Sequence, residues 1–146
     1  MITLIQRVSR ASVEVQGEVT GAIDRGILAL IGVEATDSAA SSATLLEKVL
    51  TYRIFPDDAG KMNLNIRQIG GGLLLVPQFT LVADTRKGTR PGFSGGAAPE
   101  QARERFEALL REAQAAHSPV ASGVFGADMQ VHLVNDGPVT FLLQSP

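Results

Sequence analysis

Apolar and polar residues alternate along the first third of the chain, which predicts β-strands. Val13, Val15 and Val19 are spaced by polar residues, and the Gln16-Gly17-Glu18 segment between them is typical of a hairpin turn. A more continuous apolar stretch follows at residues 26–33, as expected of a strand that is buried on both faces. The pattern therefore predicts an antiparallel hairpin followed by a central strand.

Helical spacing of apolar residues occurs in two places. The first is residues 45–50, where Asp37 or Ser38 can cap the helix by accepting hydrogen bonds from amides of its first turn. The second begins at Pro99, because proline is favoured in the first turn of a helix. The residues expected on the buried faces are Leu45, Leu46, Val49 and Leu50 in the first helix, and Ala102, Phe106, Leu109, Leu110 and Ala113 in the second.

The other apolar segments predict further strands at Leu73–Val82, Ser122–Phe125, Met129–Val134 and Val139–Gln144. Pro77 lacks an amide hydrogen, so the first of these should have an edge, a bulge or a break at that position. Residues 83–98 form a long loop without periodicity. We predict one α+β domain over residues 1–146: a β-rich, barrel-like arrangement of curved mixed or antiparallel sheets with two helices packed outside.

Composition narrows the possible chemistry. The chain has no cysteine, which excludes disulfides, thiolate zinc sites and a cysteine nucleophile. No apolar run approaches the length of a membrane span, and Arg7 interrupts the N-terminal segment too early for a signal sequence. The net charge of −2 argues against broad electrostatic adhesion to nucleic acid, so an RNA partner would need a local basic patch.

Two candidate sites arise from the residues alone. Ser94 has glycine neighbours like the nucleophile of some serine hydrolases, but it would need a histidine base, and His117 and His132 are expected at a helix end and on the polar side of a strand. We interpret this segment as a glycine-rich loop tip, and two distant histidines do not predict a metal site either. The second candidate is a group of cations in the same loop, which either contacts RNA phosphates or is a solvated surface. These cations are Arg86, Lys87 and Arg90.

Two motifs carry a family resemblance. Residues 77–81 read Pro-Gln-Phe-Thr-Leu and residues 135–140 read Asn-Asp-Gly-Pro-Val-Thr. They resemble the Ser-Gln-Phe-Thr and Asn-X-Gly-Pro-X-Thr motifs of the D-aminoacyl-tRNA deacylase family. Residues 6–8, 11–13, 52–55, 60–64 and 125–129 are similar to the family in the same order, so the resemblance covers nearly the whole chain. One departure is Pro77, which stands where the family usually has serine, and we expect it to enforce the strand break mechanically.

The resemblance implies a cytoplasmic, homodimeric hydrolase without metal or cofactor. It would cleave the ester of D-aminoacyl-tRNA, and glycine mischarged on tRNA-Ala, with no DNA or membrane partner. The family assigns catalysis to Gln78, Phe79 and Thr80, with backbone amides around Phe79 and Thr80 as oxyanion donors and Phe79 near the terminal adenine. Thr80 as a nucleophile would need an adjacent base. We therefore prefer the family picture, in which the 2′-hydroxyl of the terminal ribose assists the attacking water.

The family also implies how the D configuration is selected. The Gly137-Pro138 peptide is expected to be cis and to enter the partner's pocket, where its two carbonyl oxygens would obstruct an L side chain. Met129 and Phe79 are expected to line the substrate pocket. An alternative is an RNA-binding or dimeric scaffold module that has kept the fold without the chemistry.

Overall fold

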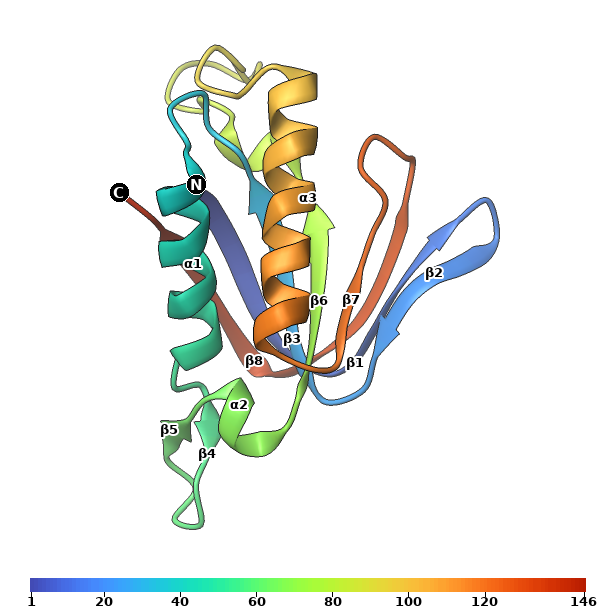
Figure 1. The fold of residues 1–146 in the computed structure, drawn as a ribbon, viewed down its shortest axis with the longest axis vertical. Helices are drawn as coiled ribbons and strands as arrows, with labels where there is room; N and C mark the ends of the chain where they lie inside the picture. Colours follow the sequence, from blue (N-terminus) through green and yellow to red (C-terminus); the bar gives the residue numbers. More distant parts are fainter.

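The computed structural model describes all 146 residues and is built on a six-stranded mixed sheet (Figure 1). The strands are β1 (Ile2–Val15), β2 (Glu18–Ile23), β3 (Gly26–Gly32), β6 (Gly72–Pro77), β7 (Val120–Ser122) and β8 (Gln130–Gln144). They follow the order β2-β1-β3-β6-β7, and β8 pairs with β1. β1 is antiparallel to β2, β3 and β8, whereas β3–β6 and β6–β7 are parallel. The expected α+β class with a mixed sheet is confirmed.

The sheet curves until its two ends approach each other. Gly21 in β2 lies so close to β7 that a Cβ there would be 2.5 Å from the carbonyl oxygen of Ser122. Only glycine allows two backbones to come this near. The turn between β1 and β2 is also as expected, because Gln16 and Gly17 both have positive φ angles (51° and 81°), the conformation of a two-residue hairpin turn.

Two long helices, α1 (Ala39–Thr51) and α3 (Pro99–Ala116), cover one face of this sheet (Figure 1). Ser38 caps α1 in a capping box with Ser41, whereas the Asp37 side chain is used elsewhere. Both buried faces agree with the prediction, except that Leu110 is only partly buried. α3 begins at Pro99 as expected.

The strands β3 and β6 are buried on both faces, as the continuous apolar runs indicated. Ile27 and Ile31 pack with the helices in a core of 20 buried residues. Leu28 and Leu74 point to the opposite face, into a second core of seven residues that the curved sheet itself encloses. The remaining members of the second core are Val8, Ala11, Val13, Ile23 and Val76.

One helix was not predicted. After the hairpin of β4 (Phe55–Pro56) and β5 (Met62–Leu64), the chain forms α2 (Ile66–Ile69), a single turn. Asn65 caps this turn by accepting a hydrogen bond from Gln68 N (2.9 Å), and the Gln68 side chain accepts one from Asn65 N (2.8 Å). Gly70 ends it in the left-handed conformation (φ 63°). Of residues 63–66, only Asn63 and Leu64 belong to a strand.

Three predicted strand boundaries were wrong. The strand expected at 73–82 ends at Pro77, and Phe79–Val82 form a 3-10 helix, η1. The strand expected at 122–125 lies earlier, at Val120–Ser122. The two segments expected at 129–134 and 139–144 belong to one long strand, β8. No helix combines the length and the apolar character needed to cross a lipid bilayer.

Candidate active site

A solvent-open cavity of about 510 Å³ lies between the end of β6, the start of α3 and the segment that joins β7 to β8. Gln78 and Phe79 line it from η1, and Met129 lines it from the opposite side. The other lining residues are Val76, Pro77, Ala97, Pro99, Ala102, Phe125, Gly126, Ala127 and Val131. The structure therefore brings together Gln78, Phe79 and Met129, three of the residues expected at the site from sequence.

The break at Pro77 determines how the backbone faces this cavity. Gln78 N still donates to Ile31 O of β3 (2.8 Å), which ties the first residue after the strand to the sheet. The first hydrogen bond of η1 runs from Leu81 N to Gln78 O (3.2 Å). The amides of Phe79 and Thr80 precede that bond, so the helix does not use them. The side chain of Gln78 donates to the Thr80 hydroxyl, which holds both polar groups at the start of η1.

An exposed aromatic pair stands beside the cavity. The Phe79 side chain is 66% exposed, and its ring packs against that of Phe93 with a centroid distance of 5.3 Å and an interplanar angle of 45°. Deeper in the wall, Phe125 packs against Phe106 of α3 (6.4 Å) and beneath the guanidinium of Arg103 (5.0 Å). The exposed pair offers an apolar surface, whereas Phe125 is held from two sides.

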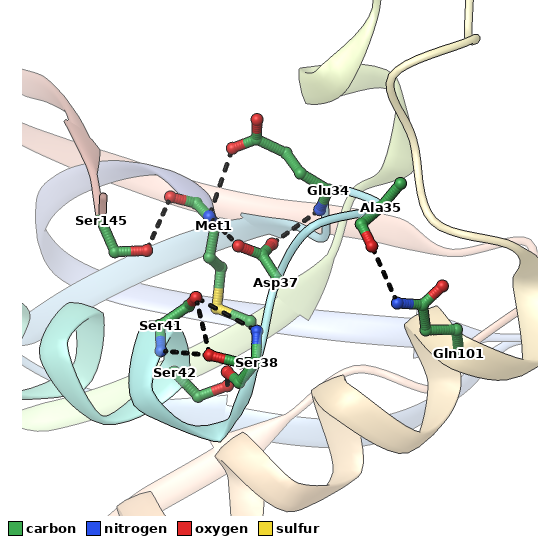
Figure 2. Close-up of polar contacts among 9 residues, drawn as sticks. All are labelled: Met1, Glu34, Ala35, Asp37, Ser38, Ser41, Ser42, Gln101 and Ser145. Carbon is green, nitrogen blue, oxygen red and sulfur yellow. Dashed lines mark hydrogen bonds and ion pairs between the residues drawn. The ribbon is translucent and has the colours of Figure 1, made fainter.

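A polar network holds the amino terminus against the loop that follows β3 (Figure 2). The Met1 ammonium forms ion pairs with Glu34 (3.2 Å) and with Asp37, whose side chain is 3% exposed. Asp37 also accepts a hydrogen bond from Glu34 N (2.7 Å). Because both carboxylates sit in the loop after β3, this network determines the path of that loop.

The loop after β3 is also hydrogen-bonded to the end of the 83–98 loop, which includes Ala97 of the cavity wall. Ala35 N donates to Gly95 O (3.1 Å), and Gln101 of α3 donates to Ala35 O (3.1 Å; Figure 2). Ala97 N donates to Val33 O (3.1 Å). The far end of the 83–98 loop is therefore attached to the sheet and to α3.

The cations of the 83–98 loop surround a second hollow of about 570 Å³, with Asp84 among them. Asp84 accepts hydrogen bonds from Arg86 Nε (2.9 Å) and Nη2 (2.7 Å). These bonds lower the pKa of Asp84 below its ordinary value and raise the pKa of Arg86. Lys87 and Arg90 take part in no ion pair.

The Gly-Pro motif lies on a bulge of β8. While β1 advances from Gln6 to Val8, its partners in β8 run from Thr140 to Asn135, so residues 136–139 leave the ladder. The Asn135 side chain closes the neck of this bulge by donating to Arg7 O (2.9 Å) and Val139 O (3.1 Å). The Arg7 side chain donates to Asp136 O (2.9 Å) and Ile54 O (2.7 Å).

The peptide between Gly137 and Pro138 is cis, as expected, and both residues are exposed. Neither lines the 510 Å³ cavity of its own chain.

The two histidines are occupied away from Ser94. His117 Nε2 donates to Gly71 O (2.6 Å), and His132 lies 3.6 Å from the carboxylate of Glu14. Neither is placed to deprotonate the serine, which lies in the exposed loop. This agrees with the interpretation of residues 92–96 as a loop tip.

Two aromatic residues at the site were not predicted there from the sequence. Phe93 lies in the segment interpreted as a loop tip, and Phe125 lies in a predicted strand and a family fragment. Ala102 was expected in the core, which it joins, but it also lines the cavity. A signal for Phe93 was present, because a large apolar side chain in a polar loop of 16 residues needs a partner outside the loop.

The fold and the cavity define the class of protein: a small α+β domain with an open, mostly apolar pocket that is lined by Gln78, by the exposed ring of Phe79 and by Met129. A family model described as D-Tyr-tRNA(Tyr) deacylase matches residues 4–144. The chain belongs to this family, and the sequence-based expectation is confirmed.

Several known proteins are similar over their full length. A D-aminoacyl-tRNA deacylase of Pseudomonas savastanoi pv. phaseolicola is 61% identical over 142 residues, which are 97% of this chain and 98% of the relative. One of Pseudomonas putida is 62% identical over 141 residues, 97% of each chain.

Two solved structures are also similar. One, described as "c-Myc DNA Unwinding Element Binding Protein", is 39% identical with a TM-score of 0.95, covering 100% of this chain and 99% of the other. Another, described as a probable eukaryotic D-amino acid tRNA deacylase, is 18% identical with a TM-score of 0.79 over 97% of each chain and supports the fold.

Proposed function

We propose that the chain hydrolyses the ester bond of D-aminoacyl-tRNA in the 510 Å³ cavity, releasing the amino acid and free tRNA. The observation that carries this proposal is the turn at Gln78-Phe79-Thr80: Gln78 and Phe79 line the cavity opposite Met129, and η1 leaves the amides of Phe79 and Thr80 unused. Family membership and the named deacylase relatives support the reaction. Because aminoacyl-tRNA is made and used in the cytoplasm, the enzyme would act there.

The proposed chemistry relies on position more than on a strong base. Attack of water on the ester carbonyl places negative charge on its oxygen, and the amides of Phe79 and Thr80 would stabilise that charge. Thr80 is a poor nucleophile here, because its hydroxyl accepts a hydrogen bond from Gln78 and neither histidine is near the motif. The 2′-hydroxyl of the terminal ribose would instead assist the water, so the substrate supplies part of the catalyst.

We also propose that the active enzyme is a homodimer. β8 lies at an edge of the sheet and exposes four large apolar side chains, which a soluble monomer would not favour. They are Leu133, Val134, Phe141 and Leu142. The bulge with Gly137 and Pro138 lies on this same strand and outside the cavity of its own chain, so it could act only on a cavity in a second copy.

In that dimer the bulge would select the configuration of the substrate. Backbone carbonyl oxygens near the α-carbon would obstruct an L side chain, and they cannot rotate away as a side chain can. A D side chain points elsewhere and glycine has none, so glycine mischarged on tRNA-Ala would also be cleaved. Met129 and Phe79 would line the space that remains for the substrate.

Two other functions are less well supported. A serine hydrolase centred on Ser94 lacks a base, and a binding module without chemistry would not need the hydrogen bond between Thr80 and Gln78, which lines the cavity. The printed name of the 39% identical structure refers to DNA binding. This chain has a net charge of −2 and its loop cations gather around one hollow, an arrangement better suited to a single-stranded end than to a duplex.

The proposal is tested by deacylation of matched D-tyrosyl-tRNA and L-tyrosyl-tRNA by the purified protein, with a chelator present. We expect release of tyrosine from the D form alone. Release from neither substrate would favour a binding module. Equal release from both would contradict the selection by Gly137 and Pro138.

A further inference from the structure

The hollow on the 83–98 loop differs from the rest of the surface in its chemistry. It is lined only by polar residues and glycine: Asp84, Arg86, Lys87, Arg90, Gly92 and Ser94. Three cations and one carboxylate leave the hollow with two positive charges, in a chain whose net charge is −2. A hollow of this kind favours an anionic ligand.

The one carboxylate is already satisfied within the loop. Asp84 is held by both hydrogen bonds from the Arg86 guanidinium and by one from Arg86 N (3.1 Å). This leaves the ammonium of Lys87 and the guanidinium of Arg90 without a counter-ion in the chain. These two groups supply the positive charge that a ligand would meet.

The loop is held in this shape before any ligand binds. Asp84 N donates to Gly92 O (2.7 Å) and Gly92 N donates to Asp84 O (3.0 Å), so the base of the loop is closed by a pair of backbone hydrogen bonds. Gly88 takes the left-handed conformation (φ 63°) at its turn. A binding surface that is already ordered loses less conformational entropy when the ligand arrives.

The position of the hollow indicates which part of the substrate it would meet. Gly92 and Ser94 line the hollow, and Phe93 between them packs on Phe79 at the active-site cavity. The hollow is therefore adjacent to the exposed Phe79–Phe93 pair, against which the base of a terminal nucleoside would pack. The next anionic group along the RNA from that nucleoside is a phosphodiester.

We infer that Lys87 and Arg90 form a subsite for the phosphodiester backbone of the single-stranded 3′ end, immediately before the terminal nucleoside. This inference rests on the proposed function. Contacts of this type raise affinity and set register without reading base sequence. They would let a chain of net charge −2 bind RNA through one local basic patch.

The test compares two substrates that differ in phosphate. One is D-tyrosyl-tRNA and the other is the D-tyrosyl ester of adenosine, which has the same ester and base but no phosphodiester. The double variant Lys87→Ala/Arg90→Ala leaves the Asp84–Arg86 pair intact. We expect its KM for the tRNA to rise about tenfold, since two exposed charge contacts are lost, while turnover of the adenosine ester is unchanged. The dependence of log KM on log salt concentration should fall by about 1.4, or about 0.7 for each phosphate contact on a single strand.

A matched control removes the same charges elsewhere. Lys48 on α1 and Arg111 on α3 are exposed and form no ion pair, so Lys48→Ala/Arg111→Ala should leave both substrates unaffected. The inference is overturned if the Lys87/Arg90 variant keeps wild-type KM and salt dependence with tRNA, or if it loses activity equally on both substrates. Failure of the wild-type enzyme on both substrates would instead refute the proposed function, and the inference with it.

Discussion

The substitution Gly137→Ala tests the proposed role of the bulge, and the size of the expected effect can be worked out from the structure. A Cβ at Gly137 would lie 2.3 Å from Val139 N and 2.7 Å from Val139 Cγ2, whereas ordinary contacts begin at 3.4 Å. The bulge must therefore shift by about 1.1 Å at its tip. Asn135 and Arg7 hold the neck, so the tip itself has to move. A displacement of about 1 Å in a positioning group can cost about 100-fold in rate.

We expect Gly137→Ala to lower kcat/KM for D-tyrosyl-tRNA by about 100-fold. Because Gly137 is exposed, the free energy of unfolding should fall by only about 1 kcal/mol. Deacylation kinetics, thermal unfolding and sedimentation velocity separate these effects. Gly95→Ala is the control, since nothing lies within 4 Å of a Cβ there. A folded dimeric Gly137→Ala enzyme with near wild-type, D-selective turnover would refute the role of the bulge.

Three further predictions address the network, the strand break and the aromatic pair. Asp37→Ala leaves the buried Met1 ammonium without its main partner, which should cost about 3 kcal/mol and lower the melting temperature by about 10 °C in calorimetry; an unchanged transition would count against the network. Pro77→Ser should keep D-tyrosyl-tRNA deacylation, because the proline acts by ending β6; complete loss would contradict that view. Phe93→Ala should raise KM for both the tRNA and the adenosine ester through loss of the stacking partner of Phe79, and an effect on tRNA alone would place Phe93 with the phosphate subsite instead.

The elements with strong periodicity could be predicted from the sequence. Residues 26–33 read as a strand buried on both faces because their side chains enter two different cores. The apolar residues at helical spacing in α1 and α3 could be recognised in the sequence because each helix buries one face against the sheet. In these segments the local pattern and the tertiary environment require the same residues.

The missed elements depend on a few polar contacts. α2 is a single turn, so it has no periodicity, and its existence rests on the reciprocal bonds of Asn65 and Gln68. Asn-X-X-Gln followed by Gly70 is a capping signal that a search for apolar spacing does not detect. The strand at 120–122 was misplaced because apolar Val124 and Phe125 resemble strand residues, although Phe125 is required by the cavity wall.

The motif residues of the proposed site fall into two groups, and only one of them lines the cavity of its own chain. Gln78 and Phe79 line the cavity with Met129, so one chain suffices to bring them together. Gly137 and Pro138 lie on the exposed bulge of β8, and they do not line the cavity of their own chain. Their proposed role requires a surface of a second copy, and the periodicity of one chain contains no information on that surface.

A dimer that joins at the apolar edge of β8 would place the bulge and a cavity in one site, so disrupting the edge should abolish selection for D substrates as well as assembly. Leu142→Glu would test this, because it puts a charge on the most exposed apolar side chain of β8 and leaves both cores intact. We expect a folded monomer that no longer discriminates D- from L-tyrosyl-tRNA. A monomer that kept full D selectivity would show that the bulge is not the selective element.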